Sequence, residues 1–238
     1  MRIDKLLANQ GVGSRKDVKK LAKKGKVLLD GKPVKDLSQH VDPTTADLTV
    51  NGQAIEYRDY IYLLLNKPVG VISATEDEKE TCVTDLLDDY YEPFDLFPVG
   101  RLDKNTTGLL LMTNDGELAH QLTSPNYNVE KVYEADILGQ VTEADVEAFE
   151  QGVELDDGYV TKPAKLEIIR SFPERSYVEV RVTEGKFHQI KRMFLAVGKK
   201  VLHLHRRSMK GLELDTSLTP GSYRELTENE LNLLKSKK

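Results

Sequence analysis

The sequence predicts an α+β protein with two units, a small one of helices and a β-hairpin followed by a larger one built on a mostly antiparallel sheet. Three observations support this prediction. Short apolar segments separated by turn residues outnumber helical patterns from Tyr60 onward, basic residues concentrate in the first 40 residues, and the polar segment 51–59 has the composition of a linker. We therefore expect a first domain with its linker at residues 1–58 and a second domain at residues 59–238.

The first unit is expected to open with two helices and to continue as a tight hairpin. Apolar residues at helical spacing in segment 3–7 predict the first helix. A second helix should begin at Ser14, with Asp17 as the partner of a capping box, and should end at Gly25. Asp30-Gly31 between two short strands is a strong signal for a two-residue hairpin turn. The pattern predicts a small apolar core and a basic helical surface.

The second unit is expected to contain more strands than helices. Its short apolar segments predict strands at 61–65, 69–74, 109–113, 132–138, 165–170, 177–183 and 201–206. Helices are expected at 142–151, where Thr142 and Asp145 can form a capping box, at 187–197 and at 227–234. Because few helices are available to connect parallel strands, most neighbouring strands should be antiparallel.

The composition is typical of a globular protein: of 238 residues, 39% are hydrophobic and 31% are charged. No apolar run reaches the roughly 18 residues that a membrane helix requires, and the N-terminus lacks the apolar core of a signal peptide. We therefore expect a cytoplasmic protein with no membrane contact, and we expect a monomer. Cys82 is the sole cysteine, which excludes an intrachain disulfide and a cysteine-based metal cluster.

Positive charge is concentrated in two segments of a chain whose net charge is −5. Residues 1–40 hold 11 Lys and Arg against 4 Asp and Glu, and residues 185–210 hold 8 Lys and Arg with no acidic residue. Lys and Arg that neutralise phosphates supply most of the sequence-independent affinity for nucleic acid. The distribution therefore favours a protein that binds a polyanion at two places, although solvated helix faces would also explain either segment taken alone.

The segment Gly100–Gly116 places one carboxylate, Asp103, between Arg101 and Lys104 and directly before an apolar strand. Nearby positive charge favours the ionised form of a carboxyl group, and an ionised, positioned Asp can act as a nucleophile or a base. The segment therefore has the properties of an active-site loop. On spacing alone, a solvated turn ahead of a strand is the simpler interpretation, since charged residues are mostly exposed.

Several motifs along the chain resemble those of the pseudouridine synthases, in particular the group related to ribosomal small-subunit synthase A. Gly100–Asp103 is similar to the tetrapeptide that carries the catalytic Asp of that family. Segments similar to its other motifs lie at 66–70, 130–133 and 184–193, and together with Gly100–Asp103 they stand in the family's order. The beginning of the chain, including Ser14–Lys16, resembles an S4 RNA-binding module. The resemblance implies an N-terminal S4 domain followed by a synthase domain with a mostly antiparallel mixed sheet.

The resemblance also implies roles for three residues of the synthase domain. Asp103 would be the catalytic residue, Lys191 would pair with it and hold its orientation, and Tyr133 would stack on the target uracil. Arg192 is the alternative to Lys191, but the two side chains point about 100° apart on a helix, so only one can reach Asp103. Phosphate binding remains the alternative role for both basic residues, and a core position remains the alternative for Tyr133.

RNA contacts are expected in both units, and the reaction requires neither a cofactor nor a metal ion. In the S4 module the candidates are Arg2, Lys5, Ser14, Arg15, Lys16, Lys19 and Lys20. In the synthase domain they are Lys67, Arg101, Lys186, His188, Gln189 and Arg192. For Lys67, Lys186, His188 and Gln189 the alternative role is to shape the active-site loop. His203 and His205 would share one strand face, where RNA contact beside Arg206 and Arg207 is a better interpretation than a metal site, because no third ligand is evident.

The expected activity is the isomerisation of one uridine of small-subunit (16S) ribosomal RNA to pseudouridine, and the expected partner is that RNA, free or within an assembling particle. Segments 160–164 and 188–192 resemble the small-subunit group more than its large-subunit relatives. A uridine of large-subunit ribosomal RNA is the alternative substrate. A catalytically inactive RNA-binding factor that assists ribosome assembly is the alternative of another class.

Overall fold

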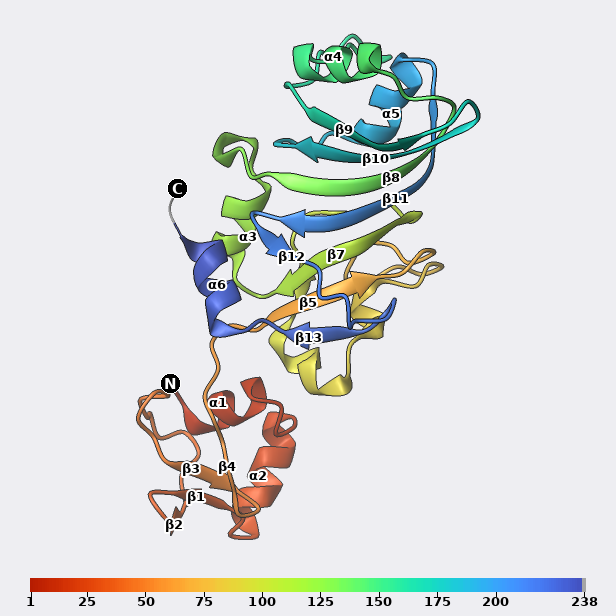
Figure 1. The fold of residues 1–238 in the computed structure, drawn as a ribbon. Helices are drawn as coiled ribbons and strands as arrows, with labels where there is room; N and C mark the ends of the chain where they lie inside the picture. The colour runs from red at the N-terminus through yellow and green to blue at the C-terminus, as the bar shows by residue number, and fades with distance from the viewer. Residues whose placement is uncertain (237–238) are drawn as a thin grey trace. The chain divides into compact units, whose positions relative to one another are not determined.

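The computed structural model describes residues 1–236, which form two compact units (Figure 1). The first unit comprises Met1–Ile61 together with Leu87–Leu96. The second comprises Tyr62–Leu86 and the chain from Phe97 onward. The segment 87–96 therefore belongs to the first unit, although its sequence neighbours on both sides belong to the second.

Two helices and a small apolar core build most of the first unit. Helix α1 spans Ile3–Asn9 and α2 spans Arg15–Lys23. The fully buried residues beneath them are Ile3, Leu6, Leu7, Val18 and Val27. The predicted start and end of α2 are confirmed, since the Ser14 side chain accepts a hydrogen bond from the Asp17 backbone N–H at 3.3 Å and Gly25 leaves the helix at a φ of +67°.

A four-stranded antiparallel sheet completes the first unit, together with the 3₁₀ helix η2 (Asp89–Phe94). Its strands are β1 (Val27–Leu29), β2 (Lys32–Pro33), β3 (Leu48–Val50) and β4 (Gln53–Ala54), in the order β2-β1-β3-β4. Asp30 and Gly31 both have positive φ, 49° and 74°, as the predicted hairpin turn requires. The expectation of a linker from residue 51 is wrong at its start, because Asn51 and Gly52, at φ 52° and 81°, form a second turn between β3 and β4.

Residues 62–225 contribute a nine-stranded mixed sheet to the second unit, which confirms the predicted α+β fold class (Figure 1). Its strands are β5 (Tyr62–Lys67), β6 (Phe97–Pro98), β7 (Thr106–Thr113), β8 (Lys131–Leu138), β9 (Lys165–Ser171), β10 (Arg175–Val182), β11 (Lys200–Met209), β12 (Leu212–Glu213) and β13 (Tyr223–Glu225). The order is β13-β5-β7-β11-β8-β10-β9, with β12 beside β11 and β6 beside β7. Among these strands only β7 and β11 pair in parallel.

The parallel pair at the centre of the sheet depends on a glycine. Gly108 of β7 lies opposite Arg206 of β11, and a Cβ atom at Gly108 would lie 2.3 Å from the Arg206 carbonyl oxygen. The two backbones can approach this closely only if residue 108 has no side chain. On its other edge β11 pairs with β8, where Arg206 lies opposite Tyr133. The register therefore places Arg206 and Tyr133 side by side.

The predicted strand at 69–74 is wrong. This segment forms an irregular loop with one isolated bridge, between Ile72 and Cys82. Gly70 adopts a φ of +87°, which an extended strand cannot contain, and its N–H donates to the Lys104 carbonyl oxygen at 2.9 Å instead of to a neighbouring strand. The apolar pattern of a strand is present, but the backbone is used to hold another loop.

Helices flank the sheet. They are α3 (Gly116–Thr123), α4 (Glu143–Gln151), α5 (Gln189–Ala196) and α6 (Glu228–Lys235), with the 3₁₀ helices η1 (Val83–Leu86) and η3 (Pro125–Tyr127). The capping box of α4 is confirmed, since the Thr142 N–H donates to the Asp145 carboxylate at 2.8 Å. Helix α3 was not predicted, although Asp115 caps it by accepting the Leu118 N–H at 3.0 Å. No helix among the described residues is long and apolar enough to cross a bilayer.

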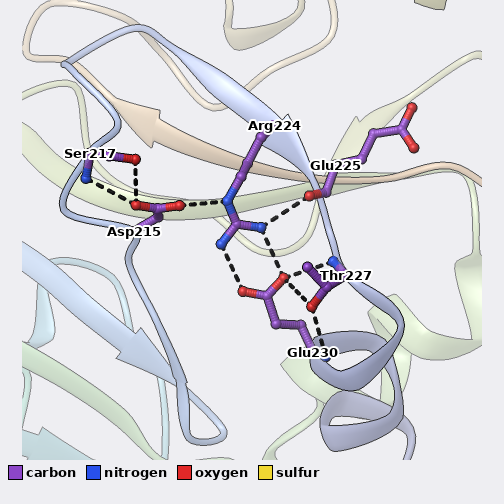
Figure 2. A network of polar contacts seen from close by, with 6 residues as sticks. All are labelled: Asp215, Ser217, Arg224, Glu225, Thr227 and Glu230. Atoms are coloured by element: carbon purple, nitrogen blue, oxygen red, sulfur yellow. Dashed lines mark hydrogen bonds and ion pairs between the residues drawn. The ribbon is translucent and has the colours of Figure 1, made fainter.

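An ionic cluster fastens the C-terminal strand and helix (Figure 2). Arg224 of β13 donates from Nε to Asp215 at 2.7 Å, and its two terminal nitrogens reach the carboxylate of Glu230 in α6 at 2.7 and 2.9 Å. Glu230 also accepts the N–H of Thr227, the N-cap of α6, at 2.8 Å. One guanidinium thus joins strand, loop and helix through charge-assisted hydrogen bonds.

Candidate active site

The loop between β6 and β7 that carries Asp103 is held by hydrogen bonds with Gly70 and Ser73. The Leu102 N–H donates to Ser73 Oγ at 3.0 Å, and Ser73 Oγ donates to the Leu102 carbonyl oxygen at 2.9 Å. On the other side of Asp103, the Lys104 carbonyl oxygen accepts the Gly70 N–H at 2.9 Å. The residues before and after Asp103 are therefore held by the irregular segment that replaces the predicted strand.

Lys67 supports the same loop from inside the protein. Its fully buried ammonium donates to the carbonyl oxygens of Pro68 at 3.0 Å, Thr106 at 3.0 Å and Lys104 at 3.4 Å. Burial lowers the pKa of Lys67 to about 8, against the opposing influence of the Asp103 charge. Of the two roles expected for Lys67, these contacts favour shaping the loop over binding RNA, because all three of its donors are used within the protein.

Asp103 contacts a lysine that lies 88 residues later in the sequence. Its Oδ2 accepts a hydrogen bond from Lys191 Nζ of α5 at 2.6 Å, and its Oδ1 lies 3.5 Å from His188 Nε2. Thr106 Oγ1 lies 3.5 Å from the same Oδ2. The side chains of Asp103 and Lys191 are 28% and 27% exposed, so the pair is fixed by contacts and still open to a substrate.

A buried glutamate holds the turn that leads into α5. Glu184 accepts hydrogen bonds from the Gln189 side chain at 2.9 Å, the Lys162 N–H at 2.8 Å and the Tyr159 hydroxyl at 2.7 Å. Gln189 is buried by this contact, which favours the second of its two expected roles, shaping the loop rather than binding RNA. His188, at a φ of 49°, ends the turn, and α5 consequently begins at 189 rather than at 187. Glu184 begins the motif segment 184–193, but its role there has no local signature, because two of its three partners lie 22 and 25 residues away.

Two basic residues near the catalytic motifs bind acidic residues of the protein. Lys104 pairs with Glu80 at 2.6 Å, so it is not the cation beside Asp103 that the sequence suggested. Arg192 donates to Asp156 at 2.6 Å and lies 2.7 Å from Asp157, in a direction away from Asp103. The expected divergence of Lys191 and Arg192 on the helix is therefore present. In this structure the Arg192 guanidinium is engaged by two carboxylates rather than free for RNA.

Two adjoining cavities open beside Asp103. The smaller, of about 90 Å³, is lined by Asp103, Tyr133 and Lys191. The larger, of about 520 Å³, is also lined by Asp103 and Tyr133 and extends to Lys131 and Arg206. Both cavities are lined by the RNA-binding candidates Arg101, Lys186 and His188. The structure therefore brings together Asp103, Tyr133 and Lys191, which the sequence places in three separate segments.

The face of β11 turned away from these cavities carries both His203 and His205, as their alternation in the sequence predicts. The His205 ring shares a 2.9 Å hydrogen bond with Thr107, and burial lowers the pKa of His205. Arg206, the next residue along the strand, is 2% exposed and lines the larger cavity on the other face of β11. Arg207 pairs with Glu179 at 3.0 Å and with Glu213 at 3.2 Å.

The RNA-binding candidates of the first unit lie on its two helices and their caps. Arg15, Lys16 and Lys19 are exposed on α2. Lys20 pairs with Asp17 at 2.9 Å, and Arg2 donates to the Asp4 carboxylate through two nitrogens at 3.0 and 2.9 Å. The candidates that complete this basic surface are Lys5, beside Asp4 in α1, and Ser14, which caps α2.

The family models match both units. Residues 1–46 match the S4 domain, and residues 61–196 match the RNA pseudouridylate synthase family. The chain belongs to the RNA pseudouridylate synthase family. The predicted family, with its N-terminal S4 domain, is thereby confirmed, and the protein is an RNA-binding enzyme of that family.

Whole-chain relatives agree with this assignment. An uncharacterized RNA pseudouridine synthase of Bacillus subtilis is 52% identical over 98% of this chain and 98% of its own length. The ribosomal large subunit pseudouridine synthase B of Bacillus subtilis is 38% identical over 99% of this chain and 96% of its own. The ribosomal small subunit pseudouridine synthase A of Escherichia coli K12 is also 38% identical, over 97% and 98%. A crystal structure of a pseudouridylate synthase matches with a TM-score of 0.68 and 33% identity, covering 98% of this chain and 99% of that one.

Proposed function

We propose that this enzyme converts one uridine of small-subunit (16S) ribosomal RNA to pseudouridine, with Asp103 as its catalytic residue. The observation that supports the role of Asp103 best is its 2.6 Å contact with Lys191 at a cavity lined by Tyr133. A carboxylate fixed by a cation and exposed to a cavity of this kind has the orientation and the access to a substrate that nucleophilic or general-base catalysis requires.

The reaction needs little more than this arrangement. The bond between uracil N1 and ribose C1′ breaks, the base turns, and C5 joins C1′; the C5 hydrogen leaves as a proton, and N1 gains a proton. Asp103 can serve by attacking the sugar or the base, or by removing a proton from the sugar. Each route requires a carboxylate held in a fixed position, and the 2.6 Å contact with Lys191 holds Asp103 there.

Tyr133 provides the surface for the base. Its side chain is 9% exposed and lines both cavities, so one part of it faces the space beside Asp103. Enzymes that act on a base inside structured RNA take that base out of its stack and hold it against aromatic side chains. We assign the target uracil to this position, where the Tyr133 hydroxyl can also relay a proton.

The RNA would be held at two places. The exposed basic residues of α2 would bind phosphates, and Arg101, Lys186 and His188 would contact RNA at the entrance of the cavities. Ribosomal RNA as the partner implies action in the cytoplasm, and one chain, acting as a monomer, contains all the groups used in this proposal.

The choice of the small subunit depends on two segments of the synthase domain. Segments 160–164 and 188–192 resemble the small-subunit group, and His188 lies beside Asp103 at the cavity entrance. The relatives named for the small and the large subunit are equally similar to this chain, at 38% identity each. A large-subunit uridine is therefore the second candidate substrate.

The first experiment is a chemical map of pseudouridines in both ribosomal RNAs after incubation with the wild-type protein or with Asp103→Asn. We expect one new site in small-subunit RNA with the wild type and none with the variant, because an amide is neither a nucleophile nor a base of comparable strength. The variant should still bind the RNA, since it changes one charge at the site. A new site confined to large-subunit RNA would overturn the subunit choice, and equal modification by the variant would overturn the role of Asp103.

The same map distinguishes catalysis by this chain from the non-catalytic alternative. A deletion strain that loses one pseudouridine, regained with the wild-type gene but not with Asp103→Asn, requires catalysis by this chain. If both genes restored growth and neither changed the map, the protein would act as an assembly factor.

A further inference from the structure

Two buried cations lie in the floor of the larger cavity, and the mechanism above uses neither. Lys131 of β8 is 8% exposed and Arg206 of β11 is 2% exposed. Both line the cavity together with Asp103 and Tyr133. Lys131 precedes Tyr133 by two residues on the same strand, and Arg206 pairs directly opposite Tyr133. The cations are therefore neighbours of the proposed base-binding residue on one face of the sheet.

Neither cation meets a carboxylate within the described part of the chain. The Lys131 ammonium donates to the Val129 carbonyl oxygen at 2.9 Å, which uses one of its three donors. Arg206 Nε donates to the Leu109 carbonyl oxygen at 2.7 Å, while its Nη2 is buried without a hydrogen-bond partner. Lys67, the third buried cation among the described residues of this unit, differs because it has three carbonyl oxygens for its three donors.

This arrangement is costly for the fold. A buried charge is normally paired, and two like charges in one place repel each other. The effect is visible at Lys131, where burial and the positive charge of Arg206 lower the pKa to about 8, a value at which the amine is still largely protonated at neutral pH. A site that keeps two unpaired cations next to catalytic groups is prepared for negative charge brought by a ligand.

We propose that Lys131 and Arg206 form a receptor for an anionic oxygen of the target nucleotide, in the larger cavity next to Asp103. The proposal rests on the proposed function, because it takes the nucleotide to be the ligand. Two oxygens of that nucleotide have the required chemistry. One belongs to its phosphodiester, and the other belongs to the uracil ring, which takes up the electron pair of the N1–C1′ bond when that bond breaks.

The first test measures binding without turnover. The full-length wild type, Lys131→Met and the control Lys165→Met are titrated with uridine 5′-monophosphate and with uridine, and affinity and melting temperature are recorded. Lys165 is a matched control because it is an exposed lysine of β9 in the same sheet. Lys131→Met should bind the better ligand about tenfold more weakly or worse, with no loss of melting temperature, since methionine has a similar shape and removes an unpaired charge. Arg206→Lys, which keeps the charge, should bind better than Arg206→Met.

The two ligands distinguish the two oxygens. If the wild type binds the monophosphate more tightly than uridine and Lys131→Met removes the difference, the phosphodiester is the anion. If the two ligands bind alike and Lys131→Met weakens both, the uracil oxygens are recognised, and the single-turnover rate on RNA should fall more than RNA affinity. The proposal is overturned if neither ligand stabilises the wild type, or if Lys131→Met binds both as the control does. Failure of the proposed function is separate, since it would appear as an unmodified RNA map whatever the outcome of these titrations.

Discussion

Two arginines of the same sheet differ in the partners that their guanidinium groups have. The guanidinium of Arg224, at the edge strand β13, meets two carboxylates and the Glu225 carbonyl oxygen (Figure 2). That of Arg206, on the central strand β11, meets one carbonyl oxygen and leaves Nη2 without a partner. Arg206 is also the more deeply buried of the two. The free-energy cost of burying charge would predict the opposite distribution, with the carboxylate partners at the buried Arg206 and none at the more exposed Arg224. An unpaired charge is most costly where water is absent.

The difference shows where this fold accepts a loss of stability. At the edge of the sheet, ion pairs join β13 to α6 and have no part in the chemistry. At the centre, the cations Lys131 and Arg206 lie in the wall of the cavity that contains Asp103. Strained or uncompensated groups concentrate at functional sites, where a ligand supplies what the protein lacks. The comparison therefore predicts that substitutions at the edge weaken the fold, whereas substitutions at the centre weaken function and relieve the fold.

The largest effect is expected for Lys131→Met, in the pH dependence of stability. Between pH 8 and 10.5 the unfolded chain holds a proton on Lys131 that the folded chain has released, because burial lowers the folded pKa to about 8. The free energy of unfolding of the wild type should therefore rise over that interval, by at most about 3 kcal/mol from this residue. Lys131→Met should lack this part of the rise and should be the more stable protein at pH 7.

Urea unfolding of both proteins from pH 7 to 10.5 measures the difference. Lys67 titrates over the same interval, since its pKa is also about 8, but it is present in both proteins and its contribution cancels. Parallel curves for wild type and Lys131→Met would show that the charge of Lys131 is compensated in the folded protein, and the contrast with Arg224 would be lost.

Arg224→Met should produce the next largest effect, with the opposite sign. The substitution leaves Asp215 and Glu230 without their shared cation and removes the link between β13 and α6. We expect a loss of about 1–2 kcal/mol, less than for a fully buried pair because water reaches this edge of the sheet. The single-turnover rate of the folded fraction should not change. Arg224→Lys is the control: it keeps the charge but cannot form the paired contact with Glu230, and it should recover part of the loss.

Local signals in the sequence account for much of the fold. The hairpin turn at Asp30-Gly31 and the capping box of Thr142 with Asp145 depend on residues at most three positions apart, and both are present as predicted. Helix α3 could have been predicted in the same way, since Asp115 stands before Gly116 as an N-cap residue and Leu118 and Leu122 share its buried face.

Long-range contacts account for what the sequence could not show. Lys191 lies 88 residues from Asp103, and only the resemblance to a known family suggested their contact. A lysine is expected at the surface, but Lys67 is bound by the carbonyl oxygens of Lys104 and Thr106, which lie 37 and 39 residues away in the sequence. The burial of Lys131 likewise follows from the position of its strand between β10 and β11. Such placements depend on the assembled sheet and have no local signature.

A smaller effect is expected in acid. The folded pKa of Glu230 is about 2, because hydrogen bonds from Arg224 and Thr227 favour its charged form, whereas its ordinary value is 4.5. Its contribution to stability is therefore complete above pH 4.5 and is lost as the pH falls towards 2. Glu230→Gln should flatten the acid side of the stability curve by about 1 kcal/mol after screening by water. Asp215, whose pKa is also about 2, should keep a residual slope in the variant, and a slope identical to that of the wild type would contradict the role of Glu230.

The smallest effect on stability is expected at an exposed cation that has no ion pair. A substitution there tests whether burial, or the lack of a partner by itself, makes an unpaired charge such as that of Arg206 costly. Lys16 of α2 is exposed and has no ion pair with any residue in the described range 1–236. Lys16→Gln should change the free energy of unfolding by less than about 0.5 kcal/mol, because water solvates the lysine. If Lys16 binds phosphate, the same variant should lower the slope of log K against log salt for RNA by about 0.7 to 0.9. A large stability change would mean that unpaired charge is costly in this protein even in water, and the unpaired state of Arg206 would then no longer indicate a ligand.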